Sequence, residues 1–172
     1  TGSVAIKFTL RETAATNAGV ILRMRIGNGY LLAVNGANGT TATVFLFRIN
    51  NGGLTSVASA GSIPFLYNTD YLYGMQISND SVNVYRHDGT SYVRRITHAP
   101  GAGTVQFSPG QVGFWVQDAD VNNQRALIDD VIISPTISGV ATNTYNFDSY
   151  ATAANIDYAL IRPYDASSYI AD

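Results

Sequence analysis

Residues 18–36, AGVILRMRIGNGYLLAVNG, hold two apolar runs on either side of a Gly-Asn-Gly triplet. In the first run apolar residues alternate with a period of two from Val20 to Ile26, which is typical of a half-buried strand. Glycine and asparagine adopt the positive φ angles that tight turns require, so residues 27–29 predict a turn. Residues 30–35 would form the return strand, and the stretch predicts an antiparallel hairpin.

The same alternation recurs on both sides of this hairpin, and turn pairs such as Asn79-Asp80 and Asp88-Gly89 separate the runs. No stretch shows a convincing helical period of 3.6 residues. Strands are expected at residues 4–11, 19–26, 30–35, 43–50, 54–59, 71–78, 82–87, 91–98, 111–117 and 125–134. About ten short strands present too many apolar faces for one open sheet. The sequence therefore predicts an all-β fold, a two-sheet antiparallel jelly-roll sandwich.

A length of 172 residues suits one domain, and the composition changes after Pro135. We expect a sandwich domain over residues 1–135 and a Tyr-rich C-terminal extension over residues 136–172. Tyrosine is enriched at interfaces because it joins apolar area to a hydrogen-bonding tip. Two hypotheses stay open: the extension packs on its own domain, or it docks on another subunit and builds a homo-oligomer or larger assembly.

Charged residues make up 13% of the chain, and the net charge is -2. The ten basic residues are scattered, so no basic stripe exists for a phosphate backbone, and nucleic-acid binding is not expected. No apolar run approaches the roughly 20 residues of a membrane span. The absence of cysteine excludes disulfides and thiolate metal sites. A single Lys and a single Glu beside abundant Asp, Asn, Thr and Gly favour an extracellular, cell-surface or virion protein.

Three motifs in order resemble the concanavalin A-like, laminin-G-like jelly-roll superfamily. They are AGVILRMRIGNGYLLAVNG at 18–36, YLYGMQISNDSVNVYRHDGTSYVRRITH at 71–98 and GQVGFWVQDADVNNQRALIDDVIISP at 110–135. The resemblance implies the fold for roughly residues 4–135. It does not imply one function, because the superfamily includes lectins, adhesion modules, glycanases, lyases and spacers.

A sugar site requires an aromatic face for stacking and a few polar groups for the hydroxyls. If Val112, Phe114 and Val116 fill the core, then Trp115 and Gln117 point outward and become candidate ligand residues. The alternative for Trp115 is burial under a loop or under the C-terminal extension.

Two further pairs extend the candidate ligand set. Arg23 and Arg25 face away from the apolar stripe of their strand, although an ordinary solvated face is the simpler interpretation. Tyr85 and His87 share one face of another strand, a combination that a glycan lyase could also use.

Glycosidases of this fold, as the resemblance implies, carry two carboxylates spaced two or four apart on one strand. This chain has no such strand. Its only glutamate, Glu12, ends the first strand, and strand alternation would turn the adjacent Asp129 and Asp130 to opposite sides. We therefore expect no enzyme, and we keep a glycan-cleaving hydrolase or lyase as the third hypothesis.

Calcium is a candidate cofactor. Asp118, Asp120 and Asn122 place oxygen donors at alternate loop positions, and Asp129 follows eleven residues after the first. An ordinary solvated polar loop is the competing interpretation.

The leading hypothesis is a non-catalytic carbohydrate-binding or adhesion module of a secreted or virion-surface protein, with a glycan or cell-surface polysaccharide as its partner. The second is a structural phage or particle component, such as a tail, fibre or decoration protein, that uses residues 136–172 for assembly.

Overall fold

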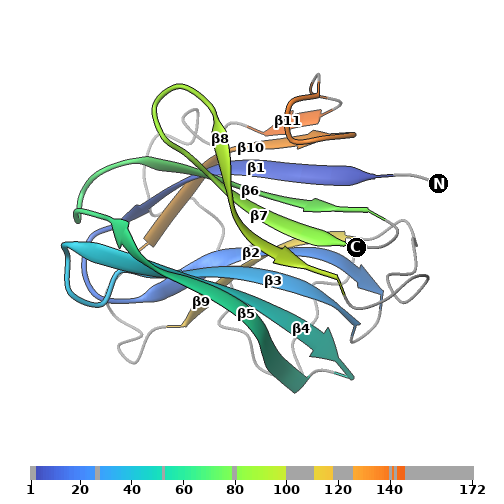
Figure 1. The fold of residues 1–172 in the computed structure, drawn as a ribbon, viewed down its shortest axis with the longest axis horizontal. Coiled ribbons are helices and arrows are strands. Elements are labelled where there is room, and N and C mark those ends of the chain that lie inside the picture. The colour runs from blue at the N-terminus through green and yellow to red at the C-terminus, as the bar shows by residue number, and fades with distance from the viewer. Residues whose placement is uncertain are drawn as a thin grey trace.

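The computed structural model describes residues 3–25, 28–51, 53–78, 81–99, 111–117, 126–139, 141 and 143–145. Within these residues all regular elements are β-strands, and they form two stacked antiparallel sheets (Figure 1). The same part of the chain contains no helix long and apolar enough to cross a membrane. The predicted all-β sandwich is confirmed.

The strands follow the predicted alternation closely. They are β1 Val4–Glu12, β2 Asn17–Arg25, β3 Asn28–Asn35, β4 Thr41–Asn50, β5 Gly53–Pro64, β6 Tyr71–Ile77, β7 Val82–His87, β8 Tyr92–His98, β9 Gln111–Gln117, β10 Ala126–Ser134 and β11 Asn143–Tyr145. One sheet has six strands in the order β11-β10-β1-β6-β7-β8, and the other has five in the order β5-β4-β3-β2-β9. The opening hairpin of the sequence is the β2–β3 pair.

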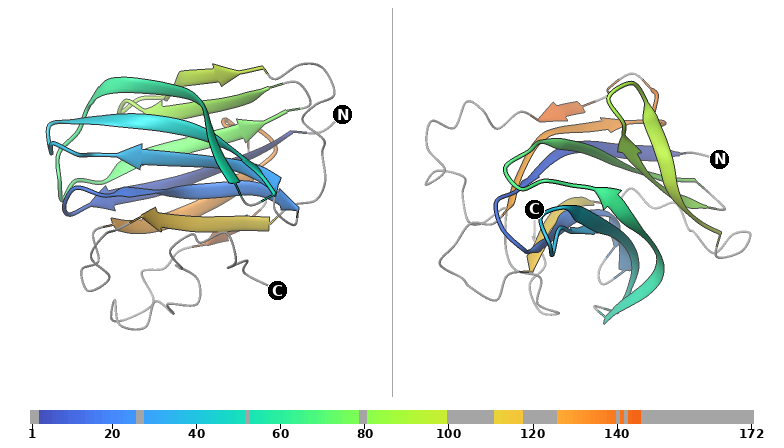
Figure 2. Two further views of the ribbon diagram at one scale, coloured as in Figure 1. Left: turned by 90° about the horizontal axis from the view of Figure 1, so that it is seen from below. Right: turned by 60° about the vertical axis from the view of Figure 1, so that its left-hand side comes forward.

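The strands β9 and β10 follow one another in sequence but belong to different sheets. β9 pairs with β2 in the five-stranded sheet, and β10 pairs with β1 in the six-stranded sheet. β5 contacts β8, so these two edge strands share one side of the sandwich. β9 and the β10–β11 edge consequently lie together on the opposite side (Figure 2).

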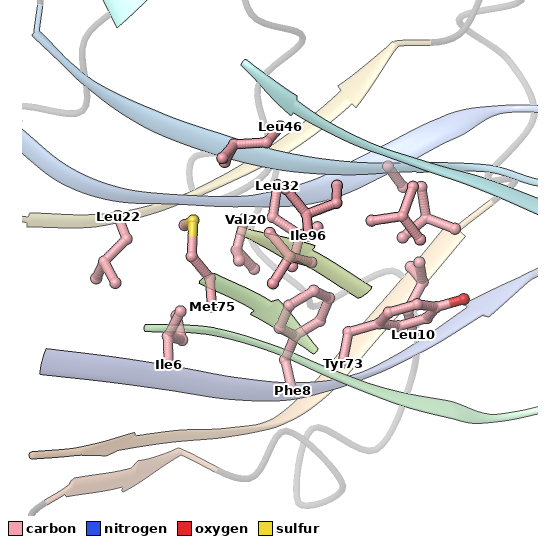
Figure 3. Close-up of a cluster of buried hydrophobic side chains, with 14 of the residues drawn as sticks. Ile6, Phe8, Leu10, Val20, Leu22, Leu32, Leu46, Tyr73, Met75 and Ile96 are labelled. Atoms are coloured by element: carbon pink, nitrogen blue, oxygen red, sulfur yellow. The ribbon is translucent and has the colours of Figure 1, made fainter. Parts of the chain in front are cut away.

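The main core lies between the two sheets, where the inward faces of the strands meet (Figure 3). Phe8, Leu22, Val84 and Val131, which come from four different strands, are buried in this core. Phe114 packs against it and is partly buried. Burial of these side chains is the dominant favourable term in forming the sandwich, at roughly 1.5–3 kcal/mol for each large aliphatic or aromatic side chain.

A β-bulge interrupts the alternation of β10. The register with β1 shifts between Lys7 and Thr9, and Asp130 has a φ of 50°, in the left-handed region. Thr9 pairs in register with Asp129, and its Oγ1 donates a hydrogen bond of 3.1 Å to Asp130 Oδ2. Both carboxylates therefore lie beside Thr9. The expectation that alternation turns them to opposite sides is wrong, because a bulge adds a residue that alternation does not count.

The described part of the C-terminal extension packs on its own domain. Ile137 is buried over Gly74, and its backbone N–H donates to Gln76 Oε1 at 2.9 Å. Lys7 Nζ donates to the carbonyl of Gly139 at 3.4 Å. Strand β11 then adds an edge to the six-stranded sheet. The sandwich thus continues as far as residue 145.

We predict that Gly19→Ala destabilises the protein while Gly113→Ala is tolerated. A Cβ at Gly19 would overlap the carbonyl of Leu32 in the neighbouring strand, whereas one at Gly113 would lie at an ordinary 3.6 Å from Ile21 Cβ. Overpacking of this kind costs about 1–3 kcal/mol or more. Urea unfolding of both variants measures the difference, and equal stability of the two would contradict the prediction.

Candidate functional site

The six sequence-predicted ligand residues lie on two different sheets. Trp115 and Gln117 belong to β9, and Arg23 and Arg25 belong to β2, so these four lie in the five-stranded sheet. The pair at positions 85 and 87 belongs to β7 in the six-stranded sheet. The structure does not bring the two groups together.

The outer face of the five-stranded sheet carries a second apolar cluster, separate from the main core. We call it the outer apolar cluster, and its buried members are Ile21, Leu31, Ala33, Ile49 and Trp115. Phe45 and Phe47 pack against it, with their ring centroids 5.8 Å apart. Strand register explains the assembly, because residues paired across neighbouring strands point to the same face.

Trp115 occupies the edge of this cluster. It pairs with Gly19 across the β9–β2 ladder, and only 5% of its surface is exposed. Trp115 does face away from the main core, as the alternation predicts, but the structure favours the burial alternative over an open stacking platform. The side chains of Gln117, Arg23 and Arg25 lie outside the described residues.

The outer face of the six-stranded sheet presents a different set of side chains. Tyr85 pairs with Arg94, and His87 pairs with Tyr92, across the β7–β8 ladder. The imidazole of His87 meets the Tyr92 ring edge-on, with centroids 5.0 Å apart and an interplanar angle of 78°. Leu72 of β6 directly precedes Tyr73, which pairs with Arg86 in the β6–β7 ladder, and it is 39% exposed. We call these five residues the β6–β8 patch.

The patch combines apolar surface with hydrogen-bonding groups. Tyr85, His87 and Tyr92 are half-buried, which leaves ring surface accessible on a fixed base, and Arg94 is exposed. The backbone N–H of Gly89 donates to His87 Nδ1 at 3.1 Å. In the neutral imidazole the proton therefore resides on Nε2, which makes that atom a donor.

The sequence pattern identified Tyr85 and His87 as candidates but not Leu72, Tyr92 and Arg94. The meander β6–β7–β8 was predicted, but its register was not. A shift in the β7–β8 register between Val84 and Tyr85 decides which residues of β8 share the outer face. The ladder places Tyr92 and Arg94 there while Ile96 pairs with Val84 in the core.

A polar cluster is buried at one end of the sandwich. Glu12, fully buried, accepts a 3.1 Å hydrogen bond from the Gly36 N–H through Oε2, and its backbone carbonyl accepts one of 2.8 Å from the Asn68 N–H. Burial raises the pKa of Glu12 to about 8, against the lowering effect of the Gly36 hydrogen bond. At neutral pH the carboxyl is therefore mostly protonated. It is a structural group, enclosed away from any ligand.

Arg86 and Tyr73 belong to the same buried region. Arg86 Nη1 donates to the carbonyl of Pro64 at 2.5 Å, and its guanidinium lies 4.3 Å from the centre of the Tyr71 ring. Burial raises the pKa of Tyr73. Within the described residues, Glu12 Oε1, the Tyr73 hydroxyl and Arg86 Nε have no hydrogen-bond partner. Buried groups of this kind are commonly bridged by internal water.

The described part of the chain holds no group of three or more His, Asp or Glu side chains that could bind a metal. Asp129 Oδ1 accepts a 2.7 Å hydrogen bond from the Asp130 N–H, a structural role at the bulge. Asp118, Asp120 and Asn122 lie outside the described residues. The calcium hypothesis stays a prediction.

Comparisons with known proteins agree on the fold. A carbohydrate-binding module, CBM66 from Bacillus subtilis, superposes with a TM-score of 0.53 at 17% identity, over 77% of this chain and 75% of that one. An ancestral congerin superposes with a TM-score of 0.51 at 11% identity, over 77% of this chain and 92% of that one.

A GH43 protein, BlXynB from Bacillus licheniformis, gives a TM-score of 0.51 at 10% identity over 73% of this chain, but this match spans only 26% of the BlXynB chain. No protein-family model and no curated protein sequence matches the chain. The fold is therefore a two-sheet jelly-roll sandwich like that of these proteins, which is the fold that the sequence motifs implied.

We predict that the protein loses stability as the pH rises from about 4.5 to about 8. The folded state raises the pKa of Glu12, so between these values it binds a proton that the unfolded chain releases. Glu12→Gln keeps an oxygen acceptor for the Gly36 N–H but cannot titrate. Urea unfolding at pH 5 and pH 8 should give a smaller pH difference for the variant than for the wild type. An equal difference in both proteins would contradict the assignment.

We also predict that Trp115→Ala lowers the free energy of unfolding by about 3–5 kcal/mol, the usual cost of truncating a buried tryptophan. Trp115→Phe should cost less because the ring still fills space over Gly19. Thermal unfolding measures both variants. A neutral Trp115→Ala would show that the indole is not packed as the structure has it.

Proposed function

We propose that the protein is a non-catalytic carbohydrate-binding module whose glycan lies on the β6–β8 patch. The observation that carries the proposal is the grouping of Tyr85, His87 and Tyr92 on one outer face of the sandwich, beside the exposed Arg94. A pyranose has one apolar face and a rim of hydroxyl groups, and such a ligand is held by aromatic rings with a few convergent polar groups.

Each group of the patch has a chemical role in this proposal. The two tyrosine rings offer faces for stacking and hydroxyl groups for hydrogen bonding. The imidazole of His87 is held by Gly89, so its Nε2–H can donate to a sugar oxygen without reorienting the ring. Arg94 adds a fork of donors that suits paired hydroxyl or carboxylate oxygens.

The similarity to CBM66 supports the carbohydrate-binding class, since that protein is named for carbohydrate binding and is matched over three quarters of its length. Two described carboxylates, Glu12 and Asp70, are engaged in structural contacts, which supports a binding role over hydrolysis. Glu12 is buried, and Asp70 forms a bidentate pair with Arg11 at 2.7 and 2.5 Å. Attachment to a secreted or virion-surface protein belongs to the same proposal and is supported by composition alone.

The test is a glycan array, followed by titration calorimetry to measure the affinity for the glycan that binds most tightly. Tyr85→Ala and Tyr92→Ala should each weaken binding about tenfold, equivalent to about 1.4 kcal/mol, because each removes a stacking surface. Tyr92→Phe should retain more affinity than Tyr92→Ala if stacking dominates.

Leu54→Ala is the matched control, because Leu54 is 37% exposed and lies on β5, in the five-stranded sheet and not in the sheet that carries the patch. It should bind like the wild type. Unchanged affinity in both tyrosine variants would show that the glycan does not bind on the β6–β8 patch. An array without any retained glycan, with the protein folded by circular dichroism, would overturn the function.

A further inference from the structure

We propose that the outer apolar cluster is the surface on which the chain's own C-terminal segment, residues 146–172, docks. The starting observation is a mismatch between position and burial. Ile21, Leu31 and Trp115 project from the outer face of the five-stranded sheet, yet their exposed fractions are 4%, 0% and 5%.

The sheet alone does not account for this burial. Every described member of the cluster comes from β2, β3, β4 or β9, that is, from the sheet itself. β9 is an edge strand, and Trp115 sits on it beside a glycine that has no side chain to shield it. An indole at a sheet edge becomes 95% covered only when another segment lies over it.

Composition identifies the occupant among the three longest stretches outside the described residues. Residues 118–125 read DADVNNQR and are almost wholly polar, and residues 100–110 contain only Val105 and Phe107 as large apolar side chains. Residues 146–172 contain nine Phe, Tyr, Leu and Ile residues, among them four tyrosines. Aromatic side chains bury about 150–250 Å² each, so the last stretch carries by far the largest apolar surface to bury.

The topology brings this segment to the correct side of the molecule. Strand β11 ends at Tyr145 on the edge of the six-stranded sheet, and that edge lies on the same side of the sandwich as β9 (Figure 2). Stacked sheets are about 10 Å apart. An extended chain of 27 residues reaches about 90 Å, so it can pass around the edge and cross the whole outer face.

Charge agrees with this path. The segment carries Asp148, Asp157, Asp165 and Asp172 against the single base Arg162. Strand β2, in the same sheet as the cluster, ends with Arg23 and Arg25. An acidic segment that crosses β2 meets opposite charge, whereas the β6–β8 patch on the other sheet stays open for a ligand.

The chain offers a direct test, because it has no cysteine and a single tryptophan. Bimane, a fluorophore that tryptophan quenches at short range, is attached to single cysteines at Ser149→Cys, Ala159→Cys or Ser168→Cys in the full chain. Each labelled protein is compared with the same protein carrying Trp115→Phe. We expect the emission of at least one label to be quenched by Trp115 and restored in the Trp115→Phe partner.

A label at Ser91→Cys, in the β7–β8 turn of the other sheet, should be unaffected by Trp115→Phe. The absence of Trp115-dependent quenching at all three segment positions would overturn the proposal. Mixing a labelled Trp115→Phe chain with unlabelled wild type tests a neighbouring chain as the host. Quenching that arises only on mixing would place the segment on a second copy and overturn the intramolecular version.

A second measurement uses the unlabelled chain. Replacing Tyr150, Tyr158, Tyr164 and Tyr169 together by serine should shift the Trp115 emission to longer wavelength and increase its quenching by acrylamide. Phe107→Ser is the control for the competing stretch, and a shift caused by Phe107→Ser alone would overturn the proposal. If the four-fold variant does not fold, the bimane measurement still decides, because its labels leave the tyrosines in place.

Discussion

Face-to-face packing of two twisted sheets is the constraint on which the rest of the structure depends. Each strand must present one apolar side to the other sheet, and residues such as Phe8, Leu32 and Met75 meet there with essentially no exposure. Because side chains alternate along a strand, filling this core fixes the opposite side chains as well. The two outer faces are therefore set by the same register that builds the core.

The outer faces differ in character although both follow from one pattern. In the five-stranded sheet, β2, β3 and β4 are apolar on both sides, as Ile21 and Leu31 alongside Val20 and Leu32 show. A strand that is apolar on both sides indicates a sheet covered on both faces. In the six-stranded sheet, β7 alternates strictly between core residues and Asn83, Tyr85 and His87, which is typical of a face in contact with solvent.

Local pattern was sufficient to predict the strands and the two-sheet fold, because alternation and turn residues are read over a few neighbouring positions. The bulge at Asp130 and the shift before Tyr85 were beyond that pattern, since both arise from pairing between strands. The burial of Glu12 could not be predicted from the local sequence pattern either. Its partner Gly36 lies 24 residues away, and a Cβ there would overlap the Phe65 ring and Glu12 Oε2. The candidate ligand residues could be found by type but not grouped by face.

The buried polar groups tie the two sheets together at one end of the sandwich. Glu12 belongs to β1 and bonds Gly36, which follows β3, while Arg86 belongs to β7 and bonds Pro64 at the end of β5. Both bonds cross from the six-stranded to the five-stranded sheet, and a buried partner left unpaired costs about 1–3 kcal/mol. The hydrophobic effect is non-directional, so it does not by itself select one set of polar partners between the sheets. These two polar contacts add directional links between the sheets, within the frame that carries Leu72, Tyr85 and Arg94.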